Sequence, residues 1–168
     1  MPVILETERL RLRTFTIADA AFVLELLNTP GWLQYIGDRG IKTLEQAQSY
    51  LANGPIMSYT TYDFGLYLVE LKEQGIPIGM SGLLKRNYLA HMDMGYALLP
   101  TYESQGYALE ITTATLNYAF TKLHLMHLAA ITDTANIRSV SLLEKLGFQF
   151  KELITIDNKD LNLFTKEA

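Results

Sequence analysis

The stretch Asp93–Phe120 reads DMGYALLP, TYESQGYALE and ITTATLNYAF, and it decides the fold. Met94–Leu99 is short, apolar and aromatic and stops at Pro100, which is typical of a buried strand. A polar loop, Glu103–Gly106, follows it. From Gly106 onward the residues of one face recur at helical spacing, at Ala108, Ile111, Thr115, Ala119 and Leu123. The stretch therefore predicts a strand, a tight loop and a long helix.

The loop before this helix is a candidate anion site. A helix that opens after a loop of small residues directs free N–H groups and the positive end of its dipole at one spot, which suits a pyrophosphate. Many strand–loop–helix units bind nothing, so a purely structural loop is the alternative. The three-glycine dinucleotide fingerprint and the GK[ST] of a P-loop are both absent, which argues against an NAD enzyme or a nucleotide triphosphatase.

Composition narrows the class of protein. The 168 residues carry a formal net charge of −4, which disfavours a broad electrostatic contact with nucleic acid. There is no Cys, so we expect neither disulfides nor a thiolate metal site, and we predict no metal. No apolar run reaches the roughly 18 residues that span a bilayer, and Met1–Arg9 lacks an apolar signal segment. We expect one domain over residues 1–168, in the cytoplasm, without membrane contact.

The rest of the chain alternates helical and strand patterns. Arg9–Arg13 alternates basic and apolar residues, which predicts a half-buried strand with three arginines on its solvent face. Capping patterns at Thr16 and Thr43 open two helices, and Asn53-Gly54-Pro55 is expected to end the second. Gly31–Gly40 is irregular and aromatic. The remaining elements are strands at 64–71, 76–85, 127–132, 148–156 and 160–165 and a helix at 136–146.

This order of elements predicts an α+β (mixed α/β) fold in which helices cover a largely antiparallel sheet. The strand–helix–strand unit of residues 93–132 is the exception, because its two strands should pair in parallel.

Four motifs in register carry a resemblance to a known family. They are TERLRLR at Thr7–Arg13, MGY-x-L-x-P at Met94–Pro100, GYA-x-E at Gly106–Glu110, and N-x-x-S-x-x-x-x-EKLGF at Asn136–Phe148. Together they resemble the GNAT N-acetyltransferase superfamily, and most of all its RimJ/RimL-type branch, which acetylates N-terminal amines of ribosomal proteins. The resemblance covers nearly the whole chain.

The resemblance implies a fold, a cofactor and the residues that hold it. In the family the central strand and the following parallel strand splay apart, helices lie on both sheet faces, and acetyl-CoA occupies the cleft. The implied cofactor contacts are the strand backbone at Ala97, Leu98 and Leu99, the loop residues Ser104, Gln105, Gly106, Tyr107 and Ala108, and Asn136, which is otherwise a helix N-cap. The chain departs from the family pattern at Glu103 and Ser104, where the phosphate loop usually has Gln or Arg and then Gly.

Acetyl transfer needs a group that takes the amine proton and a group that helps the thiolate leave. Asp93, just before the buried strand, is the candidate base, with His91 as an alternative and an exposed strand-end carboxylate as the structural reading. Ser139 lies on the apolar face of its helix, so its hydroxyl needs a partner: either the CoA sulfur or its own helix backbone. At the position of Leu143, many GNAT enzymes have a Tyr that is the proposed general acid. Tyr96 is expected in the core.

The acceptor is an open question in the sequence. Trp32 and Tyr35 either line a substrate pocket or cover the edge of the core, and we expect specificity in Gly31–Gly40 and Met57–Asp63. A small amine and a protein N-terminus both fit, and the chain is either a monomer or a homodimer. A different class of function, a non-catalytic acyl-CoA-binding module with a regulatory role, also stays open.

Overall fold

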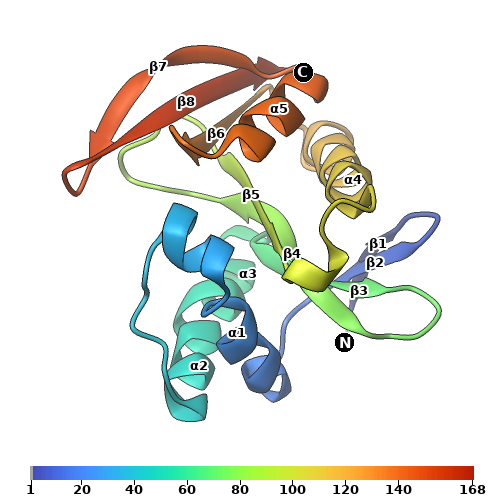
Figure 1. The fold of residues 1–168 in the computed structure, drawn as a ribbon. Helices are drawn as coiled ribbons and strands as arrows, with labels where there is room; N and C mark the ends of the chain where they lie inside the picture. The colour runs from blue at the N-terminus through green and yellow to red at the C-terminus, as the bar shows by residue number, and fades with distance from the viewer. Residues whose placement is uncertain (1) are drawn as a thin grey trace.

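A computed structural model describes residues 2–168 (Figure 1), and its centre is one eight-stranded sheet. The strand order is β1-β2-β3-β4-β5-β6-β8-β7, and all neighbours are antiparallel except β5 and β6. The predicted mixed α/β class with a largely antiparallel sheet is confirmed. The strands are β1 (Val3–Glu6), β2 (Leu10–Arg13), β3 (Leu66–Leu71), β4 (Pro77–Leu84), β5 (Asp93–Leu98), β6 (His127–Asp133), β7 (Gln149–Ile156) and β8 (Lys159–Glu167).

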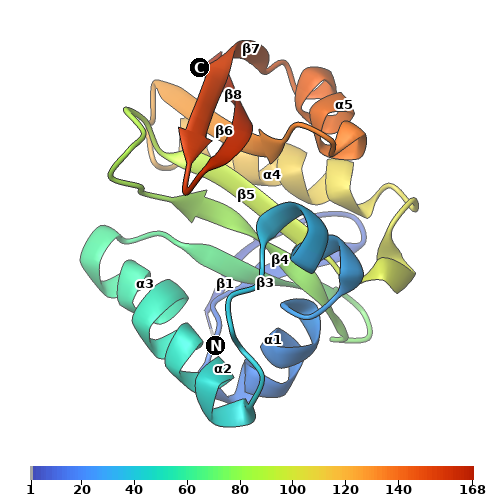
Figure 2. The same ribbon diagram turned by 60° about the vertical axis from the view of Figure 1, so that its left-hand side comes forward.

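Helices cover both faces of this sheet. Figure 2 shows α1 (Ala20–Leu26), α2 (Leu44–Leu51) and α3 (Met57–Tyr62) on one side, and α4 (Tyr107–Thr121) and α5 (Ile137–Lys145) on the other. Successive strand side chains point to opposite faces, and β3 follows this rule: Leu66 and Leu68 pack with α1 and α2, whereas Tyr67 and Val69 pack with α4. None of the helices within residues 2–168 is long and apolar enough to cross a membrane.

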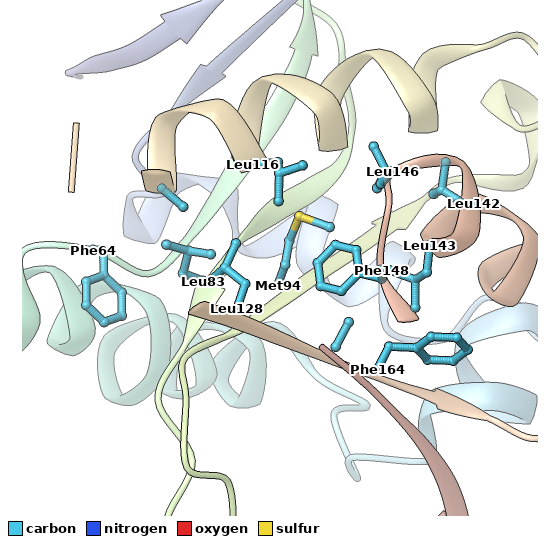
Figure 3. Close-up of a cluster of buried hydrophobic side chains, with 12 residues drawn as sticks. Phe64, Leu83, Met94, Leu116, Leu128, Leu142, Leu143, Leu146, Phe148 and Phe164 are labelled. Atoms are coloured by element: carbon cyan, nitrogen blue, oxygen red, sulfur yellow. The ribbon is translucent and has the colours of Figure 1, made fainter. Parts of the chain in front are cut away.

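A buried cluster fixes α4 and α5 against the strands (Figure 3). Leu116 of α4 and Leu143 of α5 meet Met94 of β5 and Phe148, which follows α5. Gly147 sits between α5 and β7 with φ +93° and ends the helix, as predicted. The cluster therefore holds the inward face of α5 at a fixed distance from β5.

The parallel pair β5–β6 separates almost at once. Its single register pair is Asp93 with Ala129, and the Ala129 N–H donates to the Met92 carbonyl at 2.8 Å. By contrast, β6 pairs with β8 at seven positions, from His127 to Asp133. The sheet thus has an opening between β5 and β6 beyond Asp93, and the predicted splay is confirmed.

Two predictions about the N-terminal third are wrong. The segment around Arg9–Arg13 is half of a hairpin with β1, and its arginines do not all lie in solvent. Arg13 is 8% exposed, with ion pairs to Asp19 at 2.9 Å and to Glu70 at 3.2 Å. Arg13 tolerates burial because both partners are carboxylates that are themselves nearly buried.

The second helix also continues past the predicted breaker residues. A π-helical turn, Ala52–Ile56, joins α2 directly to α3, and Pro55 lies buried inside it. A wider turn accommodates a proline that lacks the N–H donor of a regular helix. Trp32–Ile36, expected to be irregular, is likewise a π-helical turn.

Candidate active site

A cavity of about 850 Å³ opens at the gap between β5 and β6. Five of the residues singled out from the sequence line it, namely Trp32, Tyr35, Asp93, Asn136 and Ser139. Tyr96, expected in the core, lines it too. These residues come from three separate parts of the chain, so the fold gathers most of the predicted chemistry in one place.

The cavity reaches both faces of the sheet. Asp93 and Tyr96 are three residues apart on β5, so their side chains point to opposite faces. Tyr96 packs with the cluster of α4 and α5, whereas Ala97 packs with that of α1 and α2. Two molecules can therefore reach the gap from opposite sides of the sheet.

Asp93 is a buried carboxylate rather than an exposed strand end. It is 1% exposed, and Arg86 Nε lies 3.1 Å and 3.2 Å from its two carboxylate oxygens. Burial raises the pKa of Asp93 to about 6, and the neighbouring Arg86 only partly opposes this shift. A carboxylate with such a pKa accepts protons close to neutral pH.

The alternative base, His91, lies away from the cavity. Its ring stacks on that of His127, with 4.6 Å between the centroids, and it does not line the cavity. The prediction of a role for His91 is therefore not supported by its position. The chain turns after His91, so the two-residue spacing to Asp93 does not bring both side chains to the same place.

Ser139 bonds to another side chain rather than to its own helix. Its Oγ lies 3.0 Å from the Tyr96 hydroxyl, and within residues 2–168 it makes no bond to a carbonyl of α5. Thr115 on α4 behaves in the opposite way, because its hydroxyl donates to the Ile111 carbonyl at 2.8 Å. The Ser139 side chain is thus free for chemistry at the cavity.

Asn136 caps α5 and still lines the cavity. Its Oδ1 accepts the Ser139 backbone N–H at 3.3 Å. Among the described residues its Nδ2 has no hydrogen-bond partner. The two readings of Asn136 from the sequence are compatible, because capping uses the oxygen and leaves the amide nitrogen.

The loop before α4 adopts left-handed backbone angles at two residues. Gly106 is the N-cap with φ +84°, a conformation that glycine adopts readily, and Ser104 has φ +61°. The predicted contacts Ser104, Gln105, Gly106, Tyr107 and Ala108 cluster here, beyond the cavity lining. Glu103 and Ser104 both bond to Arg138 of α5, at 2.9 Å and 3.0 Å. Glu103 is therefore held by a cation from α5.

The backbone of β5 narrows the predicted cofactor contacts. The Leu99 N–H donates to the Ile78 carbonyl at 2.8 Å. The Leu99 carbonyl accepts from the backbone N–H of Tyr102. Backbone groups alternate between the two edges of a strand, so those of Ala97 also face β4 while those of Tyr96 and Leu98 face the gap. Of Ala97, Leu98 and Leu99, only Leu98 offers free backbone groups there, and Tyr96 joins it.

The TERLRLR motif has a structural role that its pattern did not reveal. Arg9 Nε lies 2.8 Å from the Glu110 carboxylate, which also accepts from the Thr7 hydroxyl at 2.5 Å. The Arg9 guanidinium also lies 4.2 Å from the centre of the Tyr107 ring. These contacts fasten the turn between β1 and β2 to the first turn of α4, next to Gly106. The hydrogen bond to Thr7 was missed because it joins residues 103 positions apart.

Comparison with known proteins agrees with this geometry. The profile of the family described as Acetyltransferase (GNAT) domain matches residues 9–149. An uncharacterized N-acetyltransferase of Bacillus subtilis, YoaA, is 30% identical over 148 residues, which is 87% of this chain and 82% of that protein.

Solved structures share the fold. An acetyltransferase from Agrobacterium tumefaciens superposes with a TM-score of 0.84 at 25% identity, over 100% of this chain and 95% of that one. RimL, a ribosomal L7/L12 alpha-N-protein acetyltransferase in complex with coenzyme A, superposes with a TM-score of 0.85 at 15% identity, over 99% and 98%. The chain therefore belongs to the GNAT acetyltransferase family, whose acetyl donor is acetyl-CoA.

Proposed function

We propose that this enzyme transfers the acetyl group of acetyl-CoA to a primary amine by direct attack in a ternary complex. The observation that carries the proposal is the cavity at the β5–β6 gap, with a buried carboxylate at one sheet face and a pair of hydroxyls at the other. Such a site can hold amine and thioester together without a covalent enzyme intermediate.

The α4–α5 side of the sheet suits the cofactor. The open edge of β5 at Tyr96 and Leu98 presents free backbone groups for an amide-containing arm, and Asn136 Nδ2 lies at the same cavity. The backbone amides of Ser104–Ala108 and the N-terminus of α4 suit its pyrophosphate. RimL, whose structure was solved in complex with coenzyme A, has the same fold.

The opposite side suits the amine. Asp93 takes up the proton that the amine loses as its nitrogen attacks the acetyl carbon. The C–S bond breaks and its electron pair stays on sulfur, towards which Ser139 donates its O–H. The protein mainly orients and desolvates the reactants, because a thiolate is already a good leaving group.

The acceptor contacts come from α1–α3 and their connections. Trp32 is 6% exposed and belongs to the core cluster of α1 and α2, yet it also borders the cavity, as Tyr35 does. The position of Trp32 is compatible with both roles considered for it, and aromatic walls suit the carbon chain beside an amine. We propose a small amine or a protein N-terminus as acceptor.

The direct test is release of the free thiol from acetyl-CoA in the presence of a panel of amines and N-terminal peptides. Turnover with at least one acceptor, dependent on both substrates, is expected. Calorimetry with CoA is run in parallel. Binding of CoA without turnover on any acceptor would contradict catalysis and support the acyl-CoA-binding module instead.

A further inference from the structure

Helix α5 carries Leu143 at the position where many GNAT enzymes have a Tyr. In this chain a tyrosine of the sheet, Tyr96 of β5, reaches α5 instead. Leu143 of α5 packs into the core and has no acidic group. Tyr96 of β5 projects towards α5, and its hydroxyl lies 3.0 Å from Ser139 Oγ. Both side chains line the cavity.

Either hydroxyl can donate in this hydrogen bond, and we take Tyr96 as the donor. Burial raises the pKa of Tyr96, so its phenol keeps its proton at neutral pH and remains a donor. A serine hydroxyl has one hydrogen and two lone pairs. If Tyr96 donates to Ser139 Oγ, the Ser139 hydrogen is left for a partner in the cavity.

The backbone around Ser139 leaves this hydrogen uncommitted. The N-cap contact of Asn136 uses the Ser139 backbone N–H and not its hydroxyl. The Tyr96 ring packs against the core cluster of α4 and α5, so the phenol is a fixed anchor for the serine rotamer.

We propose that Tyr96 is a positioning residue for the acetyl transfer: its phenol holds the Ser139 hydroxyl with the O–H aimed at the thioester sulfur. The proposal rests on the proposed function and on the placement of the sulfur near Ser139. Tyr96 keeps its own proton throughout, so no proton leaves the pair through the phenol. Its effect is to strengthen and orient the hydrogen bond that forms as charge develops on sulfur.

The test is a double-mutant cycle on kcat with acetyl-CoA and one active acceptor, using Tyr96→Phe, Ser139→Ala and the double variant. Tyr96→Phe is expected to lower kcat about tenfold and to leave the KM for acetyl-CoA nearly unchanged. In the Ser139→Ala background the same change is expected to have no further effect, because the group it orients is gone. Tyr102→Phe, outside the cavity, is the matched control.

The outcomes separate the proposals. Equal losses from Tyr96→Phe in both backgrounds would overturn the positioning role, since a purely structural residue acts without Ser139. Unchanged kcat in Tyr96→Phe would overturn it as well. If Ser139→Ala itself leaves kcat unchanged, the role proposed for Ser139 fails together with it, whereas wild-type turnover would still support the acetyltransferase function. Thermal unfolding of each variant verifies that it is folded.

Discussion

Arg138 of α5 and Glu103 of the loop before α4 form an ion pair, with 2.9 Å between Nη1 and Oε2. This pair joins α5 to the loop on which we place the cofactor pyrophosphate. A carboxylate at this position would repel a pyrophosphate, but Arg138 holds it and partly neutralises it. An incoming phosphate competes with Glu103 for the same guanidinium.

Glu103→Gln is therefore expected to tighten CoA binding. The change removes the repulsion and frees Arg138, and for exposed charges we expect an effect of about fivefold in Kd. Calorimetric titration with CoA measures it, and higher salt should shrink the difference because exposed charges are screened. Arg138→Gln should weaken binding. Weaker binding by Glu103→Gln would mean that Glu103 holds the loop in its binding conformation.

Ser139→Ala is expected to lower turnover more than it raises the KM for acetyl-CoA. The hydroxyl is proposed to act on the charge that develops on sulfur, so its loss affects the transition state more than the bound thioester. We expect a loss of about 100-fold in kcat, similar to that of a single oxyanion donor. Steady-state kinetics with varied acetyl-CoA decide the question. A rise in KM at constant kcat would assign Ser139 to binding alone.

The pH profile of kcat/KM tests Asp93. A base works in its ionised form, so activity should fall as the pH drops through about 6, the value to which burial raises the pKa of Asp93. Asp93→Asn should remove this acidic limb and lower the plateau about 100-fold. Arg86 favours the ionised carboxylate, so Arg86→Gln should move the limb to higher pH.

Protonation of the acceptor amine also lowers kcat/KM at acidic pH. This effect must be separated from the titration of Asp93. Two acceptors with different amine pKa values serve as the control. A limb that follows the amine and persists in Asp93→Asn would show that Asp93 is not the base.

Gly106→Val is expected to abolish CoA binding. The residue has φ +84°, where a β-branched side chain is strained, and an added Cβ would lie 3.2 Å from Arg9 Nη2. Both effects displace the amides that face the phosphates. Gly75→Val is the matched control, because Gly75 has φ +67° with open space around it. The control should lose stability but bind CoA, and normal CoA affinity of Gly106→Val would contradict the placement of the pyrophosphate.

Asp19→Ala should destabilise the fold. Asp19 and Arg13 form an ion pair at 2.9 Å with side-chain exposures of 10% and 9%, and Asp19 also completes the capping box with Thr16. Removing one partner of a nearly buried pair costs about 3 kcal/mol. Urea unfolding measures the change. Asp38→Ala, whose pair with Lys42 is exposed, should alter the free energy of unfolding far less. Equal effects of the two changes would contradict a special role of burial.

Local signals in the sequence predicted the local structure well. The capping boxes at Thr16 and Thr43, the strand that stops before Pro100 and the helix that starts after Gly106 all depend on neighbouring residues, and the structure confirms them. The gathering of Asp93 and Ser139 at one cavity was expected only through the family resemblance.

What failed depends on contacts far apart in the chain. Arg13 alternates like a solvent-facing residue, yet Glu70 on the neighbouring strand pairs with it in the interior. Tyr96 looks like any core aromatic until α5 places Ser139 beside its hydroxyl, 43 positions away. A proline such as Pro55 usually ends a helix. Here the π-helical turn Ala52–Ile56 accommodates it, and the helix continues.

The place of β8 between β6 and β7 has a consequence for biosynthesis. Because β6 touches β5 at one register pair only, β8 is its main partner, and β8 follows β6 and β7 in the chain. During synthesis, β6 therefore keeps an open edge until Lys159–Glu167 has been made, a state that invites aggregation or chaperone binding. Truncation within Lys159–Glu167 should leave that half of the molecule unassembled, even though it removes none of the residues proposed for catalysis.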